Sequence, residues 1–427
     1  MNNASPSNPL FYGWRIAAAS FFTLGLAIGL PYYGMTFFYD YFERPLSEGG
    51  LGWTRSTITF GLPIGTLATL WVGPLVAHRF PPRRTILMGT GLTALVLIGF
   101  GRMNGAVSIY YGLWLLYMVG NVFSGVLSHQ VLLSHWFVRQ RGLALSIAYL
   151  GISFVGALSV RFVAQPLTRE YGFRGALQLM GCLLFLTWPI VLFIMRERPA
   201  EMGLQPDGES WQPGAVSEEA PPPASLQMIL RDRIFWVLLI GGTCTTGAIG
   251  VISQHLKLIL KDRGETGQEL LDQTFSQTLL VLLIVSAVGR LLIGRLSDRL
   301  PKRHVLTLAF LPLAASIPLL FFVQPPDTPY LFSVLYGLAT GADFLLIALL
   351  AADLFGISTL VRVLAIILPV MTVGQTWAPY LIALLRERTG DYTLPLAITF
   401  LLAVVGRGVL SLLPPPAGWG PATTETD

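Results

Sequence analysis

The sequence predicts an all-α protein that crosses a membrane twelve times, and three observations support this fold class. Hydrophobic residues make up 53% of the 427 positions and charged residues only 12%. The mean hydropathy is +0.63. Because an average soluble domain carries about 25% charged residues, this composition excludes an ordinary soluble enzyme, and it also excludes a disordered chain. The apolar residues gather into runs of about 20, the length that a bilayer-spanning helix needs.

Twelve such runs follow one another along the chain, and each is predicted to form one transmembrane helix. They fall into two sets of six, separated by a polar segment. The predicted spans are 14–39, 57–78, 85–103, 107–134, 142–165, 174–195, 234–260, 274–298, 304–323, 329–352, 360–384 and 392–412.

The polar segment 196–233 divides the two sets of spans. It is rich in proline and glutamate, with Pro221, Pro222 and Pro223 in succession. Such a segment cannot bury enough apolar surface to order itself. We therefore predict an N-terminal bundle at 1–195, a cytoplasmic linker at 196–233, a C-terminal bundle at 234–413 and a disordered tail at 414–427.

The charged residues predict the topology. Lys and Arg total 28 against 23 Asp and Glu. If both termini are cytoplasmic, 15 basic residues fall in inside segments and 10 in outside segments, in the direction of the positive-inside rule. The basic excess is therefore expected of a membrane protein, and we predict no nucleic-acid partner. Because no Lys or Arg occurs in the first thirteen residues, we expect the first span to be retained rather than cleaved.

The two halves of the chain carry matching features. Gly73 and Gly294 each precede a basic cluster after the second span of their half. The sequences at 171–174 and 389–392 occupy matching places before the sixth span of each half. Two similar sets of six spans are typical of a two-bundle transporter.

The loop after the eighth span carries a motif. The sequence Gly294-Arg295-Leu296-Ser297-Asp298-Arg299-Leu300-Pro301-Lys302-Arg303 resembles the G-x-x-x-D-R-x-x-x-R loop of the major facilitator superfamily. The resemblance implies a conformational role for Gly294, Asp298, Arg299 and Arg303. Glycine allows close helix packing, and the basic residues can anchor in the anionic leaflet. In the N-terminal copy His78 stands where an aspartate is usual.

Shorter sequence features occur near the ends of several predicted spans. They are Tyr12-Gly13-Trp14-Arg15, Trp136-Phe137, Arg198-Pro199 through Asp207-Gly208, His255-Leu256, Asp262-Arg263-Gly264 and Asp353-Leu354-Phe355-Gly356. Together they resemble the prokaryotic monocarboxylate transporter and oxalate:formate antiporter branch of this superfamily. The resemblance implies a small organic anion as substrate, carried with a proton, and a bacterial inner membrane with both termini cytoplasmic.

Arg290 is the strongest candidate for a substrate-binding residue. It lies about 24 Å into the eighth predicted span at 1.5 Å per residue, where a charge costs from a few to about ten kcal/mol or more. Its planar guanidinium can hold a carboxylate through two hydrogen bonds. The family resemblance implies the same role, and a structural ion pair is the alternative. Animal members place an aspartate one turn before this arginine, but Ser286 stands here, so an Asp–Arg pair on one helix cannot carry the proton.

Two other residues are candidates for proton coupling. Asp343 lies in the middle of the tenth span, where it could carry the proton or serve as a resting counter-ion of Arg290. His255 lies near the outer end of the seventh span, and histidine titrates near neutrality. The alternatives are helix packing for Asp343 and an interfacial histidine without such a task for His255.

The remaining candidates could orient the substrate or line its cavity. A polar or charged side chain within a span can serve a ligand, but buried asparagine also joins helices and arginine can extend to the headgroups. Ordinary packing is the alternative for the aromatic residues. These candidates are Asn121, Tyr336, Tyr32, Tyr33, Phe37 and Arg161.

Enzyme signatures are missing from the sequence. It contains no Walker loop, no G-x-S-x-G elbow and no H-E-x-x-H motif. Cys182 and Cys244 both lie in apolar runs, so we predict no metal site, and we predict no cofactor. We expect a secondary transporter of a monocarboxylate such as lactate or pyruvate. A dicarboxylate exchanger, an exporter of apolar compounds and a non-transporting membrane sensor are the alternatives.

Overall fold

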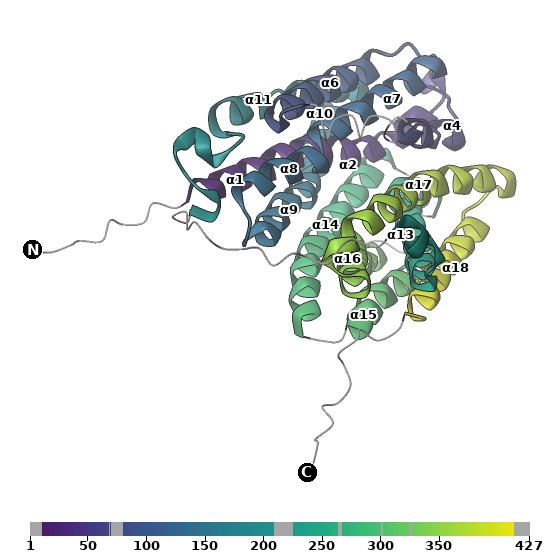
Figure 1. Ribbon diagram of the computed structural model, residues 1–427. Coiled ribbons are helices and arrows are strands. Elements are labelled where there is room, and N and C mark those ends of the chain that lie inside the picture. The colour runs from purple at the N-terminus through teal and green to yellow at the C-terminus, as the bar shows by residue number, and fades with distance from the viewer. Residues whose placement is uncertain are drawn as a thin grey trace, which may run out of the picture. The chain divides into compact units, whose positions relative to one another are not determined.

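The computed structural model describes residues 11–67, 69, 80–208, 225–263, 267–299, 302–323 and 327–413, and these form helices joined by short connections (Figure 1). No strand occurs in these ranges, so the predicted all-α fold is confirmed. The chain divides into two compact units. The first comprises Met1–Trp53 and Phe60–Val216, and the second comprises Thr54–Thr59 and Ser217–Asp427.

The helices of the first unit are often interrupted. Three of its interruptions are π-helical turns, at Gly25–Gly29, Val160–Ala164 and Ile190–Ile194. Such turns are rare in proteins, and those that occur often lie at functional sites. Its helices are α1 (Tyr12–Leu24), α2 (Leu30–Phe37), α3 (Tyr39–Glu43), α6 (Pro82–Arg102), α7 (Val107–Ser124), α8 (Val126–Trp136), α9 (Arg141–Ser159), α10 (Gln165–Leu184) and α11 (Thr187–Pro189).

The second unit contains longer continuous helices. Four of them exceed the roughly 20 residues that cross a bilayer. Its helices are α4 (Arg55–Thr59), α12 (Leu226–Arg231), α13 (Arg233–Arg263), α14 (Gln268–Arg299), α15 (Lys302–Ser316), α16 (Asp327–Phe355), α17 (Ile357–Thr389) and α18 (Thr393–Leu410).

Nine stretches of the described chain are long and apolar enough to cross a membrane. One of them, Arg141–Ile194, is broken at Gly172, whose φ of 67° interrupts the helix and separates two predicted spans. The predicted span 304–323 corresponds to the shorter apolar helix Leu308–Phe321. The second half of the predicted span 57–78, with Gly73 and His78, lies outside the described residues.

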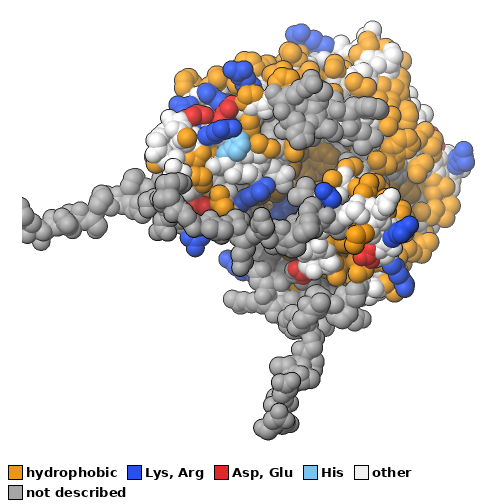
Figure 2. All heavy atoms as spheres, viewed as in Figure 1, with side chains coloured by type: hydrophobic (Ala, Val, Ile, Leu, Met, Phe, Trp, Pro, Cys, Tyr) orange, Lys and Arg blue, Asp and Glu red, His pale blue; other side chains and the backbone are white. Residues whose placement is uncertain are grey.

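The exterior of the described helices is apolar. Large hydrophobic side chains stand exposed along them, for example Phe154 at 47%, Val288 at 56% and Leu401 at 58%. Figure 2 shows hydrophobic side chains over much of the visible face. Contiguous apolar surface of this extent is unfavourable in water and matches the hydrocarbon of a bilayer, as expected of a multi-pass membrane protein.

Three of the short sequence features meet at one end of the first unit. The Tyr12 ring lies 5.6 Å from the Trp136 ring, and the Trp14 ring lies 4.9 Å from the Phe137 ring. The Asp207 carboxylate accepts the backbone N–H groups of Val138 and Arg139 at 2.9 and 2.8 Å. These contacts tie the segment 198–208 to the end of α8.

Glycines set the closest helix contacts in each unit. A methyl group on Gly151 of α9 would overlap the carbonyl oxygen of Phe21 in α1, and one on Gly250 of α13 would overlap that of Gln375 in α17. Small residues at such crossings let backbones approach closely, which is the main source of helix association in lipid.

This packing predicts the effect of one added methyl group. Gly151→Ala should destabilise the protein by about 1–3 kcal/mol, because the backbone of Phe21 must move to accept it. Gly142→Ala is the matched control, since a methyl group there meets nothing within 4 Å. Thermal unfolding in detergent measures both variants. Equal melting temperatures for the two variants would contradict the close contact between Gly151 and the backbone of Phe21.

Candidate functional site

Arg290 lies within the candidate span Gln268–Ile293 of α14. It stands nine residues before the end of the helix at Arg299, about 14 Å along the axis at 1.5 Å per residue. Its side chain is half-buried. An arginine in such a span keeps its charge, so it must be balanced by a protein group or by a ligand.

The backbone around Arg290 is fixed by a close crossing of α14 and α16. A methyl group on Gly341 would lie 2.4 Å from the carbonyl oxygen of Ser286 and 2.7 Å from the backbone nitrogen of Arg290. One turn earlier, Gly337 faces the carbonyl oxygen of Leu282 in the same way. The two glycines therefore bring α16 against the turn of α14 that carries Arg290.

Asp343 follows Gly341 by two residues in α16. Its side chain lies outside the described residues, as do the side chains of Gly294, Asp298, Arg299 and Arg303. The coupling role of Asp343 and the conformational role of the loop motif stay predictions.

Tyr336 joins α16 to α13. It is buried, its hydroxyl donates to the carbonyl oxygen of Ile249 at 2.7 Å, and it lies 2.9 Å from the hydroxyl of Ser253. Because a tyrosine hydroxyl has one proton, Ser253 is the donor in the second hydrogen bond. This arrangement makes Tyr336 a tie between the helices, and its role in orienting a substrate stays a prediction.

His255 is fully buried in α13, and both of its ring nitrogens have partners. Nε2 lies 2.9 Å from the carbonyl oxygen of Pro379, and Nδ1 lies 2.7 Å from the hydroxyl of Tyr392. Because a carbonyl can only accept, Nε2 carries a proton and Nδ1 of the neutral ring accepts from the hydroxyl. Burial raises the pKa of Tyr392 above its ordinary value, so this hydroxyl keeps its proton.

An ion cluster lies about two helical turns beyond His255 along α13, around Asp262. The Arg55 guanidinium pairs with both carboxylate oxygens of Asp262, at 2.8 and 2.7 Å. The Arg386 guanidinium binds the same carboxylate at 2.7 Å. Arg55 is only 2% exposed, and its guanidinium lies over the ring of Tyr392, 5.4 Å from the ring centroid. Sequence reasoning missed this cluster, because it treated all three charged residues as ends of helices or loops.

The cluster explains why residues 54–59 belong to the second unit while the chain on both sides belongs to the first. Beside Arg55, the backbone N–H and the hydroxyl of Ser56 donate to the Glu387 carboxylate at 2.7 and 2.9 Å. Four charge-assisted hydrogen bonds thus hold α4 to α13 and α17.

A second buried ion pair joins α13 to α14. The Lys257 ammonium, 1% exposed, lies 2.6 Å from the Asp272 carboxylate. The Gln268 amide donates to the same carboxylate oxygen at 2.9 Å. A buried pair of this kind is costly to break, because each partner would be left charged in an apolar environment.

The candidates of the first unit lie on three helices. Asn121 is half-buried on α7, one turn after the buried Tyr117. One turn later α7 ends at Gly125, whose ψ of −155° separates it from α8. Arg161 lies in the π-helical turn after α9, where it donates to the side-chain oxygen of Gln165 at 2.8 Å.

The aromatic candidates lie on α2. The half-buried rings of Tyr32 and Tyr33 meet edge to face at 5.1 Å, and Tyr33 lies against Gly156. Phe37 is fully buried and packs edge to face on Phe38 at 5.3 Å. Contact of these rings with a substrate stays a prediction.

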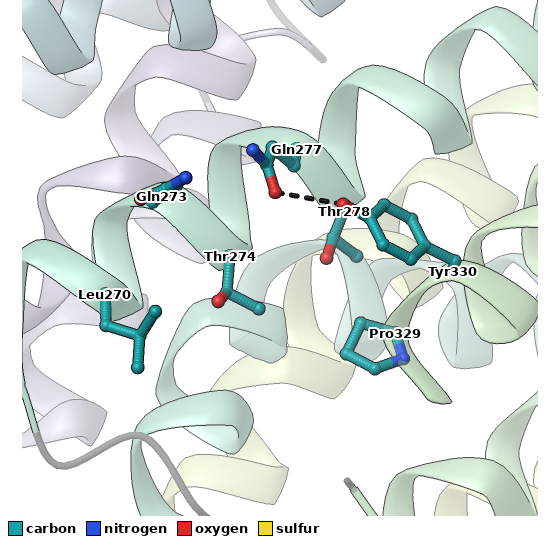
Figure 3. Close-up of a pocket in the computed structure, with 7 residues that line it drawn as sticks. All are labelled: Leu270, Gln273, Thr274, Gln277, Thr278, Pro329 and Tyr330. Atoms are coloured by element: carbon teal, nitrogen blue, oxygen red, sulfur yellow. Dashed lines mark hydrogen bonds between the residues drawn. The ribbon is translucent and has the colours of Figure 1, made fainter. Parts of the chain in front are cut away.

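A cavity of about 230 Å³ lies between the first turns of α14 and α16. The Tyr330 hydroxyl donates across it to the Gln277 side-chain oxygen at 2.9 Å (Figure 3). Its lining offers amides, hydroxyls and apolar groups but no charged side chain. It is lined by Leu270, Gln273, Thr274, Gln277, Thr278, Pro329 and Tyr330. Within the described part of the chain, no group of three His, Cys, Asp or Glu residues could hold a metal.

Comparison with known proteins gives consistent results. A family model described as Major Facilitator Superfamily matches residues 18–326 and 271–426. Monocarboxylate transporter 11 of Mus musculus is 28% identical over 406 residues, which cover 90% of this chain and 83% of that transporter. Monocarboxylate transporter 13 of Bos taurus is 26% identical over 419 residues, covering 94% and 89% of the two chains.

A solved structure shares the fold. A bacterial homologue of the human lysosomal transporter Spinster aligns with a TM-score of 0.69 and 13% identity, covering 95% of this chain and 97% of that one. At this identity the alignment supports the fold alone.

The contacts of Tyr336 predict a structural effect for its hydroxyl. Tyr336→Phe should lower the free energy of unfolding by about 1 kcal/mol, because it removes the hydroxyl that bonds the buried carbonyl of Ile249 and the half-buried hydroxyl of Ser253. Tyr330→Phe, which removes a partly exposed hydroxyl, should have a smaller effect. Unfolding in detergent followed by circular dichroism measures both. A larger loss of unfolding free energy for Tyr330→Phe than for Tyr336→Phe would contradict the role of Tyr336 in joining α16 to α13.

Proposed function

The chain belongs to the Major Facilitator Superfamily, and from that premise we propose that it transports a small organic anion, a monocarboxylate such as lactate or pyruvate. The chain is a multi-pass membrane transporter. We infer that transport proceeds by alternating access, as in other two-bundle carriers, in a bacterial inner membrane with both termini cytoplasmic.

Arg290 carries the proposal for the substrate class. It is a guanidinium within an apolar span, held in place by the crossing of α14 with Gly341 of α16. A guanidinium is suited to two parallel hydrogen bonds with a carboxylate, and such bonds are about twice as strong as neutral ones. Relatives named as monocarboxylate transporters at 26–28% identity support the same class.

We propose further contacts for the substrate and for the proton. Asn121 and Tyr336 would orient the anion, and Tyr32, Tyr33, Phe37 and Arg161 would line its path. The proton would be carried by Asp343 or by His255. His255 suits this task because its Nδ1 accepts a hydrogen bond in the neutral state and can gain a proton.

Exchange without a proton is a second candidate mechanism. Ser286 stands one turn before Arg290, where the animal transporters have an aspartate, and Ser286 is 3% exposed. A carrier without that carboxylate could exchange two anions and bind no proton.

Substitution of Arg290 tests the substrate class. In proteoliposomes, Arg290→Ala should raise the KM for labelled lactate about 10- to 100-fold, the equivalent of a lost charged hydrogen-bonding pair. Arg290→Lys should retain part of the activity, because it keeps the positive charge but loses the planar pair of donors that can make two hydrogen bonds to one carboxylate. Arg407→Ala, a half-buried arginine in α18, is the matched control. Undiminished uptake in both Arg290 variants would remove this residue from the mechanism.

A pH jump separates the two mechanisms. If a proton accompanies the anion, an inward proton gradient without internal substrate should drive uptake above its equilibrium level. Obligate exchange should give no uptake until a counter-substrate is loaded inside. If uptake is independent of the proton gradient but requires an internal anion, the mechanism is exchange and not symport.

A further inference from the structure

A chain of contacts links the Asp262 ion cluster to the buried His255. Asp262 accepts hydrogen bonds from both terminal nitrogens of Arg55, the Arg55 guanidinium lies 5.4 Å from the centroid of the Tyr392 ring, and the Tyr392 hydroxyl lies 2.7 Å from Nδ1 of His255. The chain ends where Nε2 of His255 meets the carbonyl oxygen of Pro379 at 2.9 Å. Arg55 is the member of this chain that comes from the segment 54–59.

The positions of the protons follow from these partners. A carbonyl can only accept, so Nε2–H donates to Pro379, and Nδ1 of the neutral ring accepts from the Tyr392 hydroxyl. If His255 gains a proton, Nδ1–H points at the Tyr392 oxygen, and the hydroxyl proton must find another acceptor. The added charge then lies on one side of the Tyr392 ring while the Arg55 guanidinium lies over the same ring.

The charges around His255 have the same effect. Arg55 and Arg386 contribute two positive charges, and the carboxylates of Asp262 and Glu387 contribute two negative charges, so these four groups sum to zero. Toward α14, Lys257 and Asp272 neutralise each other. A proton on His255 would bring the total to +1 in a poorly screened environment, where the imidazolium and the two guanidinium groups repel one another. Departure of Arg55 would restore a total of zero.

We propose that binding of residues 54–59 to α13 and α17 and protonation of His255 exclude each other, so that a proton arriving at His255 releases Arg55 from Asp262 and from the Tyr392 ring. By linkage, the reverse also holds: bound Arg55 excludes the proton to the same degree. Arg55 and Tyr392 are therefore positioning residues that control the occupancy of His255. The place of this switch in transport rests on the proposed proton coupling, but the switch itself does not require a substrate.

Cross-linking of the segment tests this proposal directly. Ser56→Cys and Glu387→Cys replace two residues that are in hydrogen-bond contact, and Cys182→Ser with Cys244→Ser removes the native thiols. A short bismaleimide, allowed to react to completion, joins the two cysteines when the segment is bound and labels them separately when it is released. Between about pH 7.5 and about pH 5.5, which bracket the ordinary histidine range, the cross-linked fraction should fall by about twofold or more.

Three variants identify the group that titrates. His255→Gln, which is neutral at both pH values, should keep the cross-linked fraction high throughout, and His255→Asn is the second neutral replacement if the first does not fold. Asp262→Asn should lower the fraction at both pH values, because Arg55 loses its counter-ion. His135→Gln is the matched control and should preserve the pH dependence.

Two outcomes would overturn the proposal. One is a cross-linked fraction that does not change with pH while His255 is present. The other is a fall at low pH that survives in a folded His255 variant. Because no substrate is added, either result leaves the carboxylate uptake measurement unaffected, and a failure of lactate uptake leaves the cross-linking result intact.

Discussion

A helix surrounded by hydrocarbon has no water to satisfy its polar groups, and this constraint governs the structure of both units. Hydroxyl side chains bond back to their own helix, as when Thr90 donates to Ile86 and Thr246 donates to Gly242, each at 2.8–2.9 Å. Larger polar side chains bond to carbonyl oxygens of neighbouring helices, as Tyr336 and His255 do. Polar groups therefore serve as ties between helices, and glycines bring those helices close enough for the ties to form.

Charged groups in such an environment need a counter-charge or a task. Lys257 has Asp272 as a dedicated partner, and the pair is buried on both sides. Arg55 and Arg386 share the single carboxylate of Asp262, so one positive charge in that cluster is not neutralised by it. Arg290 lies elsewhere, on the turn of α14 that meets Gly341. We propose Arg290 for the substrate because its planar guanidinium suits a carboxylate.

Patterns within single segments were predictable from the sequence. The runs of apolar residues located the helices, and the depth of Arg290 follows from its distance to the ends of its run. The break at Gly172 between two spans is also local, because a residue with a φ of 67° interrupts a helix. These features depend only on neighbouring residues, so one sequence suffices to find them.

Pairings between distant segments were not predictable. Arg55 and Asp262 lie 207 positions apart, and each resembles an ordinary charge at the end of a span. His255 was recognisable as a titratable group, but its contact with Tyr392, which directly precedes α18, depends on how α13 and α18 pack. The same holds for Gly341, whose closeness to Arg290 appears only when α14 and α16 cross. The role of a polar residue in such a protein depends on which helix packs against it, and one sequence alone does not identify that helix.

Binding of a carboxylate by Arg290 can be measured with two ligands that differ in charge. Purified protein in detergent is heated with lactate or with lactamide, the neutral amide of the same shape. A ligand that binds the folded state stabilises it by about 2.7 kcal/mol at a hundred times its Kd. If Arg290 holds the carboxylate, lactate raises the melting temperature, lactamide does not, and Arg290→Gln abolishes the difference. An equal shift with both ligands, or a lactate shift that persists in Arg290→Gln, would contradict this role of Arg290.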